Sequence, residues 1–269
     1  MSRSFTYSAL TLRVKASGES NREAWFLTAE EGILRATVFG GPKSRLRAQV
    51  APYHSGTLWI YHDPVRDSRK VSDFDVKTYR TGIRELWERA MASGAVAETI
   101  LTSQGGGGNW NEALKLAENV LDALETAEAD ACSRLAVYFL WHWAAILGQR
   151  PDLSVCATCS CDVKRDEALW YSAKKEALFC ENCMRRHKAG QNAGHNTGQN
   201  GGLPAPTDGD SWFRLGPGAR LWLSGTETLP AAALSRVSLD NPSLEQAKAL
   251  TKAVMAGALG RRLSTWDGI

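Results

Sequence analysis

The sequence lacks the features that mark membrane-spanning and secreted proteins. No uninterrupted apolar run approaches the roughly 18 residues that a membrane-spanning helix needs. The N-terminal residues, Met-Ser-Arg-Ser-Phe-Thr-Tyr-Ser, contain no apolar core of the kind found in a signal peptide. We therefore expect a cytoplasmic protein.

Recognisable catalytic motifs are also missing. Residues 105–108 are all glycine, but neither a Lys-Ser/Thr pair nor a G-x-G-x-x-G pattern accompanies them, so we interpret them as a flexible connection. Cys132 lies in an apolar helical run, which disfavours a reactive thiolate. We therefore expect no enzymatic activity. The histidines without partners that suggest a catalytic triad are His54, His62, His142 and His195.

The net charge is small, but the charged residues are unevenly distributed. The net charge is only +3 at pH 7. Residues 1–80 contain thirteen Lys or Arg and eight Asp or Glu, whereas the remainder contains nineteen basic and twenty-one acidic residues. A modestly basic N-terminal domain suits a nucleic-acid phosphate backbone. The length of 269 residues favours two domains, or one domain with an insertion.

The six cysteines contain two Cys-x-x-Cys pairs, which are the most specific motif of the chain. Cys156 and Cys159 form the first pair, and Cys180 and Cys183 follow after twenty intervening residues. This spacing matches a tetrahedral zinc site, in which each pair supplies two adjacent corners. Because four cysteines leave no open position for water, we predict one structural Zn²⁺ ion that stabilises a small module.

Other readings of these cysteines stay open. The pairs could form disulfides or a dithiol redox motif, although no thioredoxin-like pattern surrounds them. Cys161 is an alternative to Cys159 as a ligand, and His187 could replace a thiolate. These alternatives keep a zinc or thiol enzyme open as one hypothesis for the function of the chain.

Short alternating segments dominate the first 78 residues. Glycines separate them, and no long helical pattern interrupts them. Five short strands with turns at this spacing predict a small barrel of the oligonucleotide-binding (OB) type. The predicted strands are residues 5–14, 24–28, 33–39, 48–55 and 57–62, with an extended exit segment at 71–76.

Beyond residue 77 the hydrophobic period changes to about 3.6, which indicates helices. The predicted fold class is α+β: an OB-type barrel and an all-α domain into which the zinc module is inserted. The predicted domains are 1–78 (barrel), 79–150 and 208–269 (helical), 151–188 (zinc insertion) and 189–207 (flexible linker rich in Gly, Asn and Gln). The predicted helices are residues 77–91, 96–103, 110–124 with Asn109 as N-cap, 135–147, 217–224, and 243–263 with a capping box from Ser243 to Gln246.

A basic loop at residues 40–47 is the first candidate for nucleic-acid contact. It carries Lys43, Arg45 and Arg47 between two predicted strands, and flexible cations there neutralise phosphates without reading bases. A merely solvated loop is the competing interpretation. Four further cations lie on or beside neighbouring strands: Arg13, Lys15, Arg22 and Arg35. Aromatic rings on which bases could stack are Trp25, Phe26, Trp59 and Tyr61, of which about half should face the core.

The order of several motifs resembles the bacterial RecO family of recombination mediators. The similar motifs are Leu10-Thr-Leu-Arg13, Gly18-Glu-Ser20, Glu31-Gly-Ile-Leu-Arg35, Pro42-Lys-Ser-Arg45, the two Cys-x-x-Cys pairs and Gly260-Arg-Arg-Leu-Ser264. The chain departs from that pattern at Phe39-Gly-Gly, where many members carry an extra basic residue, and in the long Gly-Asn-Gln segment after Cys183.

The resemblance implies an OB-fold domain that binds single- and double-stranded DNA and anneals complementary strands. It further implies cooperation with a RecR-type mediator to load a RecA-type recombinase onto strands coated by single-stranded-DNA-binding protein. The acidic C-terminal tail of that protein would bind the helical part, and the chain would associate with the nucleoid. The alternative hypothesis is a zinc-stabilised protein-interaction scaffold that does not bind DNA.

Overall fold

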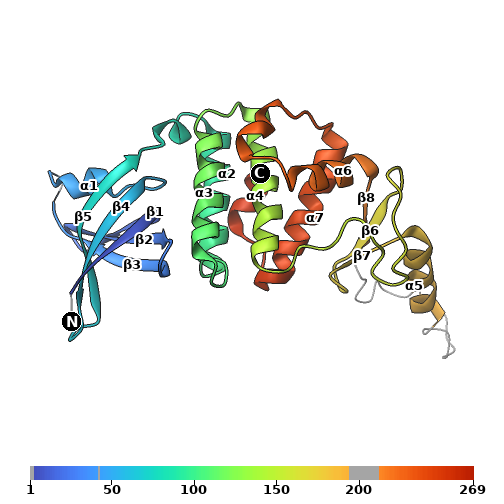
Figure 1. Ribbon diagram of the computed structural model, residues 1–269, viewed down its shortest axis with the longest axis horizontal. Helices are drawn as coiled ribbons and strands as arrows, with labels where there is room; N and C mark the ends of the chain where they lie inside the picture. Colours follow the sequence, from blue (N-terminus) through green and yellow to red (C-terminus); the bar gives the residue numbers. More distant parts are fainter. Residues whose placement is uncertain (1–2, 42, 194–211) are drawn as a thin grey trace, which may run out of the picture. The chain divides into compact units, whose positions relative to one another are not determined.

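The computed structural model describes residues 3–41, 43–193 and 212–269, which fall into two compact units. The first unit comprises Met1–Gly148, Pro230–Val237 and Arg262–Ile269, and the second comprises Gln149–Leu229 and Ser238–Arg261. This grouping places the N-terminal strands and the helices that follow them in one unit (Figure 1). In the described part of the chain, no helix is both long and apolar enough to cross a membrane.

Five strands of the first unit form a closed barrel. They are β1 (Ser4–Ser17), β2 (Asn21–Thr28), β3 (Gly32–Val38), β4 (Ser55–Asp63) and β5 (Ser68–Thr78). The barrel closes in the order β1-β2-β3-β5-β4, with all pairs antiparallel except β3 and β5. The predicted OB-type barrel is therefore confirmed.

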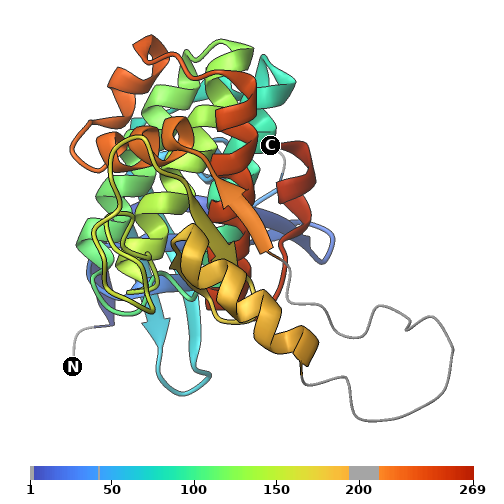
Figure 2. The ribbon, with the colours of Figure 1, turned by 90° about the vertical axis from the view of Figure 1, so that its right-hand side faces the viewer.

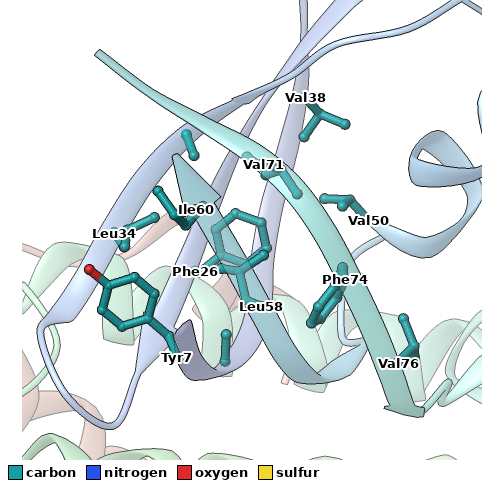
Figure 3. Close-up of a cluster of buried hydrophobic side chains, with 13 residues drawn as sticks. Tyr7, Phe26, Leu34, Val38, Val50, Leu58, Ile60, Val71, Phe74 and Val76 are labelled. Atoms are coloured by element: carbon teal, nitrogen blue, oxygen red, sulfur yellow. The ribbon is translucent and has the colours of Figure 1, made fainter. Parts of the chain in front are cut away.

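Alternation along the strands fills the barrel interior. In β3, Leu34, Ala36 and Val38 are buried while Arg35 is exposed. Figure 3 shows the buried side chains converging inside the barrel, where Phe26 and Phe74 meet edge to face with centroids 6.0 Å apart. Each large side chain buried in this way stabilises the fold by about 1.5–3 kcal/mol.

The predicted strand at residues 48–55 is wrong. Helix α1 (Arg45–Gln49) and a turn occupy this part of the chain, and β5, predicted only as an exit segment, is the fifth strand. Leu46 and Val50 are four residues apart, the spacing of one helix face, and both pack against the barrel core. An extra residue in β5 opposite Trp59 and Ile60 breaks its alternation, which explains why the sequence pattern understated this strand.

The helices of the first unit follow the barrel directly. They are η1 (Thr81–Arg84), α2 (Trp87–Thr102), α3 (Trp110–Glu125), α4 (Ala129–Ile146), η2 (Ala231–Arg236) and η3 (Ser264–Gly268). The predicted apolar stripe of α3 is buried, and α4 is buried on nearly all sides, as expected of a central helix. The helix predicted at 77–91 begins later because β5 continues to Thr78, and the helix predicted at 96–103 is the second half of α2.

Arg80 joins the barrel to the helices within the first unit. Its side chain is buried, and its backbone adopts the left-handed region at φ 32°. Its guanidinium donates to Asp122 Oδ1 on α3 at 2.7 Å, to the Tyr53 carbonyl at 2.8 Å and to Ser55 Oγ at 3.0 Å. One side chain therefore satisfies acceptors on both sides of the junction.

The second unit combines a small sheet with three helices. Its elements are β6 (Leu169–Ser172), β7 (Ala177–Phe179), β8 (Trp212–Leu215), α5 (Glu181–Ala193), α6 (Pro217–Thr226) and α7 (Asn241–Leu259). The sheet order is β7-β6-β8, and α5 lies beside the sheet (Figure 2). The first residues of the predicted linker, 189–193, belong to α5, and 194–207 lie outside the described residues together with His195.

The capping box predicted at the start of α7 is wrong. Asp240 is the N-cap, and its carboxylate accepts the Ser243 N–H at 2.9 Å, so Ser243 lies within the first turn. Gln246 instead accepts the Gly216 N–H at 2.6 Å. The helix ends at Gly260, whose left-handed backbone (φ 65°) terminates it before the predicted end at residue 263. Asn109 is the N-cap residue of α3, as predicted, although its side chain contacts Glu112 and makes no capping hydrogen bond.

Candidate metal centre and nucleic-acid interface

The four predicted cysteine ligands meet in the second unit. Cys156 and Cys159 lie in the loop before β6, Cys180 follows β7, and Cys183 lies in the first turn of α5. Their sulfur atoms all lie within 4.8 Å of one another, and those of Cys159 and Cys180 are 3.8 Å apart. A tetrahedral site with Zn–S bonds of about 2.3 Å has sulfur–sulfur edges of about 3.8 Å. The donor set and its spacing therefore fit a zinc ion.

Backbone hydrogen bonds hold the first cysteine pair in place. The Cys156 N–H donates to the Cys161 carbonyl at 3.1 Å, and the Ser160 N–H donates back to the Cys156 carbonyl at 2.9 Å. The Ala157 N–H donates to the Leu178 carbonyl at 2.9 Å, which ties this loop to β7. Cys156 and Cys183 are buried beside Phe179 and Met184. The cluster thus has its own small apolar core.

Cys161 lies next to the cluster but outside the four-sulfur set. Its sulfur is hydrogen-bonded to that of Cys159 at 3.1 Å, which lowers the pKa of Cys159 to about 6 and raises the pKa of Cys161 to about 12. Burial raises the pKa of Cys183 to about 12. A metal ion that binds here must displace protons, so its affinity should increase with pH.

The ring nitrogens of His187 contact other side chains and not the sulfur atoms of the cluster. Its Nδ1 lies 2.8 Å from Lys175 Nζ, and its Nε2 lies 3.1 Å from Thr158 Oγ1. Both ring nitrogens are therefore hydrogen-bonded, and His187 is not part of the four-sulfur set. The geometry favours Cys156, Cys159, Cys180 and Cys183 as ligands over either alternative.

A group of cations surrounds Trp25 on the outside of the barrel. Arg13 on β1 and Arg35 on β3 are the cross-strand neighbours of Trp25 on β2. The Lys15 ammonium lies 5.9 Å from the centre of the indole ring, and the Arg35 guanidinium lies 5.5 Å from it. Arg35 also pairs with Glu23 at 2.5 Å, which reduces its free charge. The structure therefore brings together three of the seven predicted DNA-contacting cations.

The other predicted cations lie at α1 and the end of the barrel. Arg22 belongs to the inward-facing set of β2, and its Nη1 donates to the Arg47 carbonyl at 3.3 Å. Burial, with the charge of Arg47, lowers the pKa of Arg22. Lys43 and Arg45 are exposed, and no carboxylate pairs with them in the described part of the chain. Arg22 and the three cations of the predicted loop thus form a second basic group.

Aromatic side chains divide between the core and the surface. Phe26 is fully buried, so it is not available to stack with a base. Trp25, Trp59 and Tyr61 are half-buried on outward-facing positions. The exposed side chain of Phe39 was not among the predicted stacking residues, although it directly precedes the basic loop.

Sequence reasoning missed a further aromatic–cation group at Tyr61. Lys70 is the cross-strand partner of Tyr61, and its ammonium lies 4.5 Å from the ring centre. Arg3 Nη1 donates to the Tyr61 hydroxyl at 3.3 Å. Recognising this group requires β5 as a barrel strand in register with β4, and the bulge in β5 hides that register in the sequence.

Comparisons with known proteins match both parts of the chain to one family. Residues 1–79 match the family model described as recombination protein O N terminal, and residues 84–197 match that described as recombination protein O C terminal. The two models together cover most of the chain. A comparison with curated proteins found none that matches.

Proposed function

The chain belongs to the RecO family of recombination mediators in DNA repair, and on this premise we propose that it acts by binding DNA without covalent chemistry. The observation that supports this most is the group of Arg13, Lys15 and Arg35 around Trp25 on the outside of an OB-type barrel. Cations neutralise phosphates, and an indole ring supplies a stacking surface that tolerates any base.

The barrel surface suits both single- and double-stranded DNA. Lys and Arg on flexible side chains contact phosphates in either form, since they do not depend on base identity. The exposed Lys43 and Arg45 extend the positive surface toward α1. Annealing of complementary strands follows from the same charges, because neutralised backbones repel each other less.

We propose that protein partners bind to the helical parts of the chain. These are a RecR-type mediator, the acidic C-terminal tail of single-stranded-DNA-binding protein and, indirectly, a RecA-type recombinase. Loading would require the barrel to hold the strand while the partner proteins exchange on it. A protein with these contacts would associate with the nucleoid.

The metal centre has a structural role in this proposal. Cys156, Cys159, Cys180 and Cys183 would hold one Zn²⁺ ion, which supplies folding energy by linking the loop before β6 to the start of α5. Four thiolates leave no position for a substrate or a water molecule.

A triple variant in the predicted loop tests the proposed DNA contact. We expect Lys43→Ala, Arg45→Ala and Arg47→Ala together to weaken oligonucleotide binding and to lower the salt slope by about 2–3, since each phosphate contact contributes about 0.9. Arg22 donates to the Arg47 backbone carbonyl, so the truncation leaves that contact in place. Fluorescence anisotropy at several salt concentrations measures both quantities, and circular dichroism checks the fold.

The same measurement separates the proposal from a scaffold that binds only proteins. The control is Arg69→Gln with Lys77→Gln, which removes two barrel cations that are paired with Glu31 and Asp75. A wild-type protein that shows no affinity for oligonucleotides at low salt, while its helical part captures a protein partner, would favour the scaffold.

A further inference from the structure

The second unit carries a basic surface where the β6–β7 turn meets α5. Lys174 and Lys175 lie in the turn, and Arg185 and Arg186 lie on α5; all four are exposed. This surface belongs to a different compact unit from the barrel. Neither the metal centre nor the barrel surface requires these residues.

Contacts around His187 fix the turn against the helix. The Lys175 ammonium donates to His187 Nδ1 at 2.8 Å and lies 5.7 Å from the centre of the Phe179 ring. The other ring nitrogen, Nε2, lies 3.1 Å from Thr158 Oγ1, so His187 contacts both the turn and the loop of the first cysteine pair. The charge of Lys175 is therefore held in a defined position.

Among the residues that the structure describes, no carboxylate pairs with the two central cations, Lys175 and Arg186. In the described residues, neither Lys175 nor Arg186 forms an ion pair. Glu181 pairs with Arg185 at 2.6 Å. The carboxylate of Glu176, in the same turn as Lys175, lies against Gly257 of α7. Two unneutralised positive charges thus remain on this surface.

An aromatic pair lies beside these charges. The His187 ring stacks on Trp212, with ring centroids 6.2 Å apart and an interplanar angle of 26°. The ring centroids of Trp212 and Phe179 are 5.2 Å apart. His187 and Trp212 are half-buried, and the indole nitrogen of Trp212 is buried. Proteins bind single-stranded nucleic acid with cations that lie next to aromatic rings.

We propose that Lys175, Arg186 and the His187–Trp212 pair form a second contact surface for a single strand of nucleic acid. The inference rests on the proposed function and deepens it, because it assigns one strand to each unit of the protein. Annealing brings two negatively charged backbones together, and a protein that neutralises both lowers the repulsion on both sides. We name Lys175, Arg186, His187 and Trp212 together the α5 surface.

An acidic peptide is the competing occupant of a positive surface. The α5 surface combines its cations with the stacked rings of His187 and Trp212, and aromatic rings of this kind stack on the bases of a single strand. The cavity of about 590 Å³ in the same unit is lined by Arg150, Arg165 and Arg220 and includes no residue of the α5 surface. The combination of cations with aromatic rings favours a nucleic-acid strand over an acidic peptide.

The test uses the zinc-loaded full chain. It compares a double variant, which carries both Lys175→Gln and Arg186→Gln, with a control that loses the same number of charges. The control, Arg165→Gln with Arg261→Gln, removes two exposed cations from other elements of the same unit. Arg186→Gln alone is the second test variant, because it leaves the His187 contacts intact. Zinc content and thermal melting check that each variant is folded.

Two readouts are needed, with oligonucleotides as the probes. Anisotropy at protein excess reports the binding of one labelled strand, and energy transfer between two labelled complementary strands reports annealing. We expect the double variant to bind one strand as the control does and to anneal more slowly than the control. Arg186→Gln should slow annealing by a smaller amount, because it removes only one of the two cations.

The outcomes distinguish this inference from the proposed function. Annealing by both test variants at the rate of the control would overturn the inference and leave DNA binding by the barrel intact. A double variant that loses binding of a polyglutamate peptide but anneals normally would identify the surface as a peptide site and would also overturn it. Failure of the wild-type chain to bind any oligonucleotide would instead overturn the proposed function.

Discussion

Single sulfur atoms decide how the metal centre is built. The sulfur atoms of Cys156, Cys159, Cys180 and Cys183 come from two segments and lie within 4.8 Å of one another. Cys161 contacts Cys159 and Cys180 but lies outside this set. The spacing of the pairs predicted this set, because two residues between cysteines fix the reach of each pair. The contacts of His187 with Lys175 and Thr158 could not be predicted, since they join segments that are distant in the chain.

Removal of one ligand should release the metal and unfold its surroundings. We expect Cys180→Ser to lose stoichiometric zinc and Cys161→Ser to retain it, because only Cys180 belongs to the four-sulfur set. Structural zinc sites contribute about 10–16 kcal/mol of apparent binding free energy, so chelation of the wild type should also unfold the module locally. Elemental analysis and near-ultraviolet circular dichroism measure the two effects. The reverse order of zinc content in the two variants would contradict the assignment.

His54 should make the stability of the first unit dependent on pH. Burial lowers its pKa, although its hydrogen bond with the Gln49 carbonyl at 2.8 Å opposes the shift and Arg84 and Arg80 add to it. As pH falls below the ordinary value of about 6.5, the unfolded chain binds a proton before the folded chain does, so the free energy of unfolding decreases. Each unit of pKa difference is equivalent to about 1.4 kcal/mol.

The pH effect is measured by urea unfolding of the wild type and His54→Gln between pH 5 and pH 8. We expect the wild type to lose more stability than the variant as pH falls from about 7. His62→Gln is the control, since His62 is less buried and pairs with Asp67 at 3.2 Å. Equal slopes for the wild type and His54→Gln would show that His54 does not carry the effect.

At the scale of elements, local sequence patterns predicted what local forces determine. Strands β1 to β3, the stripe of α3 and the buried α4 follow from hydrophobic period. Tertiary contacts decided the elements that the sequence misassigned. Helix α1 forms where Leu46 and Val50 pack against the barrel, and the bulge in β5 exists only in register with β4. The cations around Trp25, which are Arg13, Lys15 and Arg35, were each predicted as DNA contacts. Their grouping around one ring was not predicted, because the sequence of a single strand does not reveal its cross-strand register.

The contact between the β2–β3 hairpin and α3 depends on a glycine. Gly32 has φ +72°, and an added Cβ atom would lie 2.7 Å from Trp110 Nε1. Gly18 has a similar φ of +67° with open space around it. We expect Gly18→Ala to destabilise by about 1 kcal/mol through backbone strain, and Gly32→Ala to destabilise by about 2–4 kcal/mol because a collision adds to the strain.

Denaturant unfolding of the two alanine variants measures this difference. A matched pair with the same backbone conformation isolates the packing of the hairpin against α3. Similar losses in the two variants would mean that Trp110 moves aside without a penalty, so the hairpin would not be fixed by this contact.

At the scale of the whole molecule, the family, the barrel and the cysteine cluster support one another. Both family models belong to recombination protein O, and they cover the barrel and the part of the chain that contains the four cysteines. Each compact unit carries its own basic surface with an aromatic ring beside it, at Trp25 in the first unit and at Trp212 in the second. This distribution agrees with the proposal that the protein binds more than one nucleic-acid strand.

The central claim is that the cations around Trp25 bind DNA phosphates. The most direct measurement is the salt dependence of oligonucleotide affinity for the wild type, for Arg13→Gln with Lys15→Gln, and for the control Arg69→Gln with Lys77→Gln. Arg13 and Lys15 have no ion-pair partner among the described residues, whereas Arg69 and Lys77 are paired. We predict that the slope of log K against log salt becomes shallower by about 2 for Arg13→Gln with Lys15→Gln and changes little for the control. An unchanged slope and affinity in the Arg13 and Lys15 variant would contradict the claim.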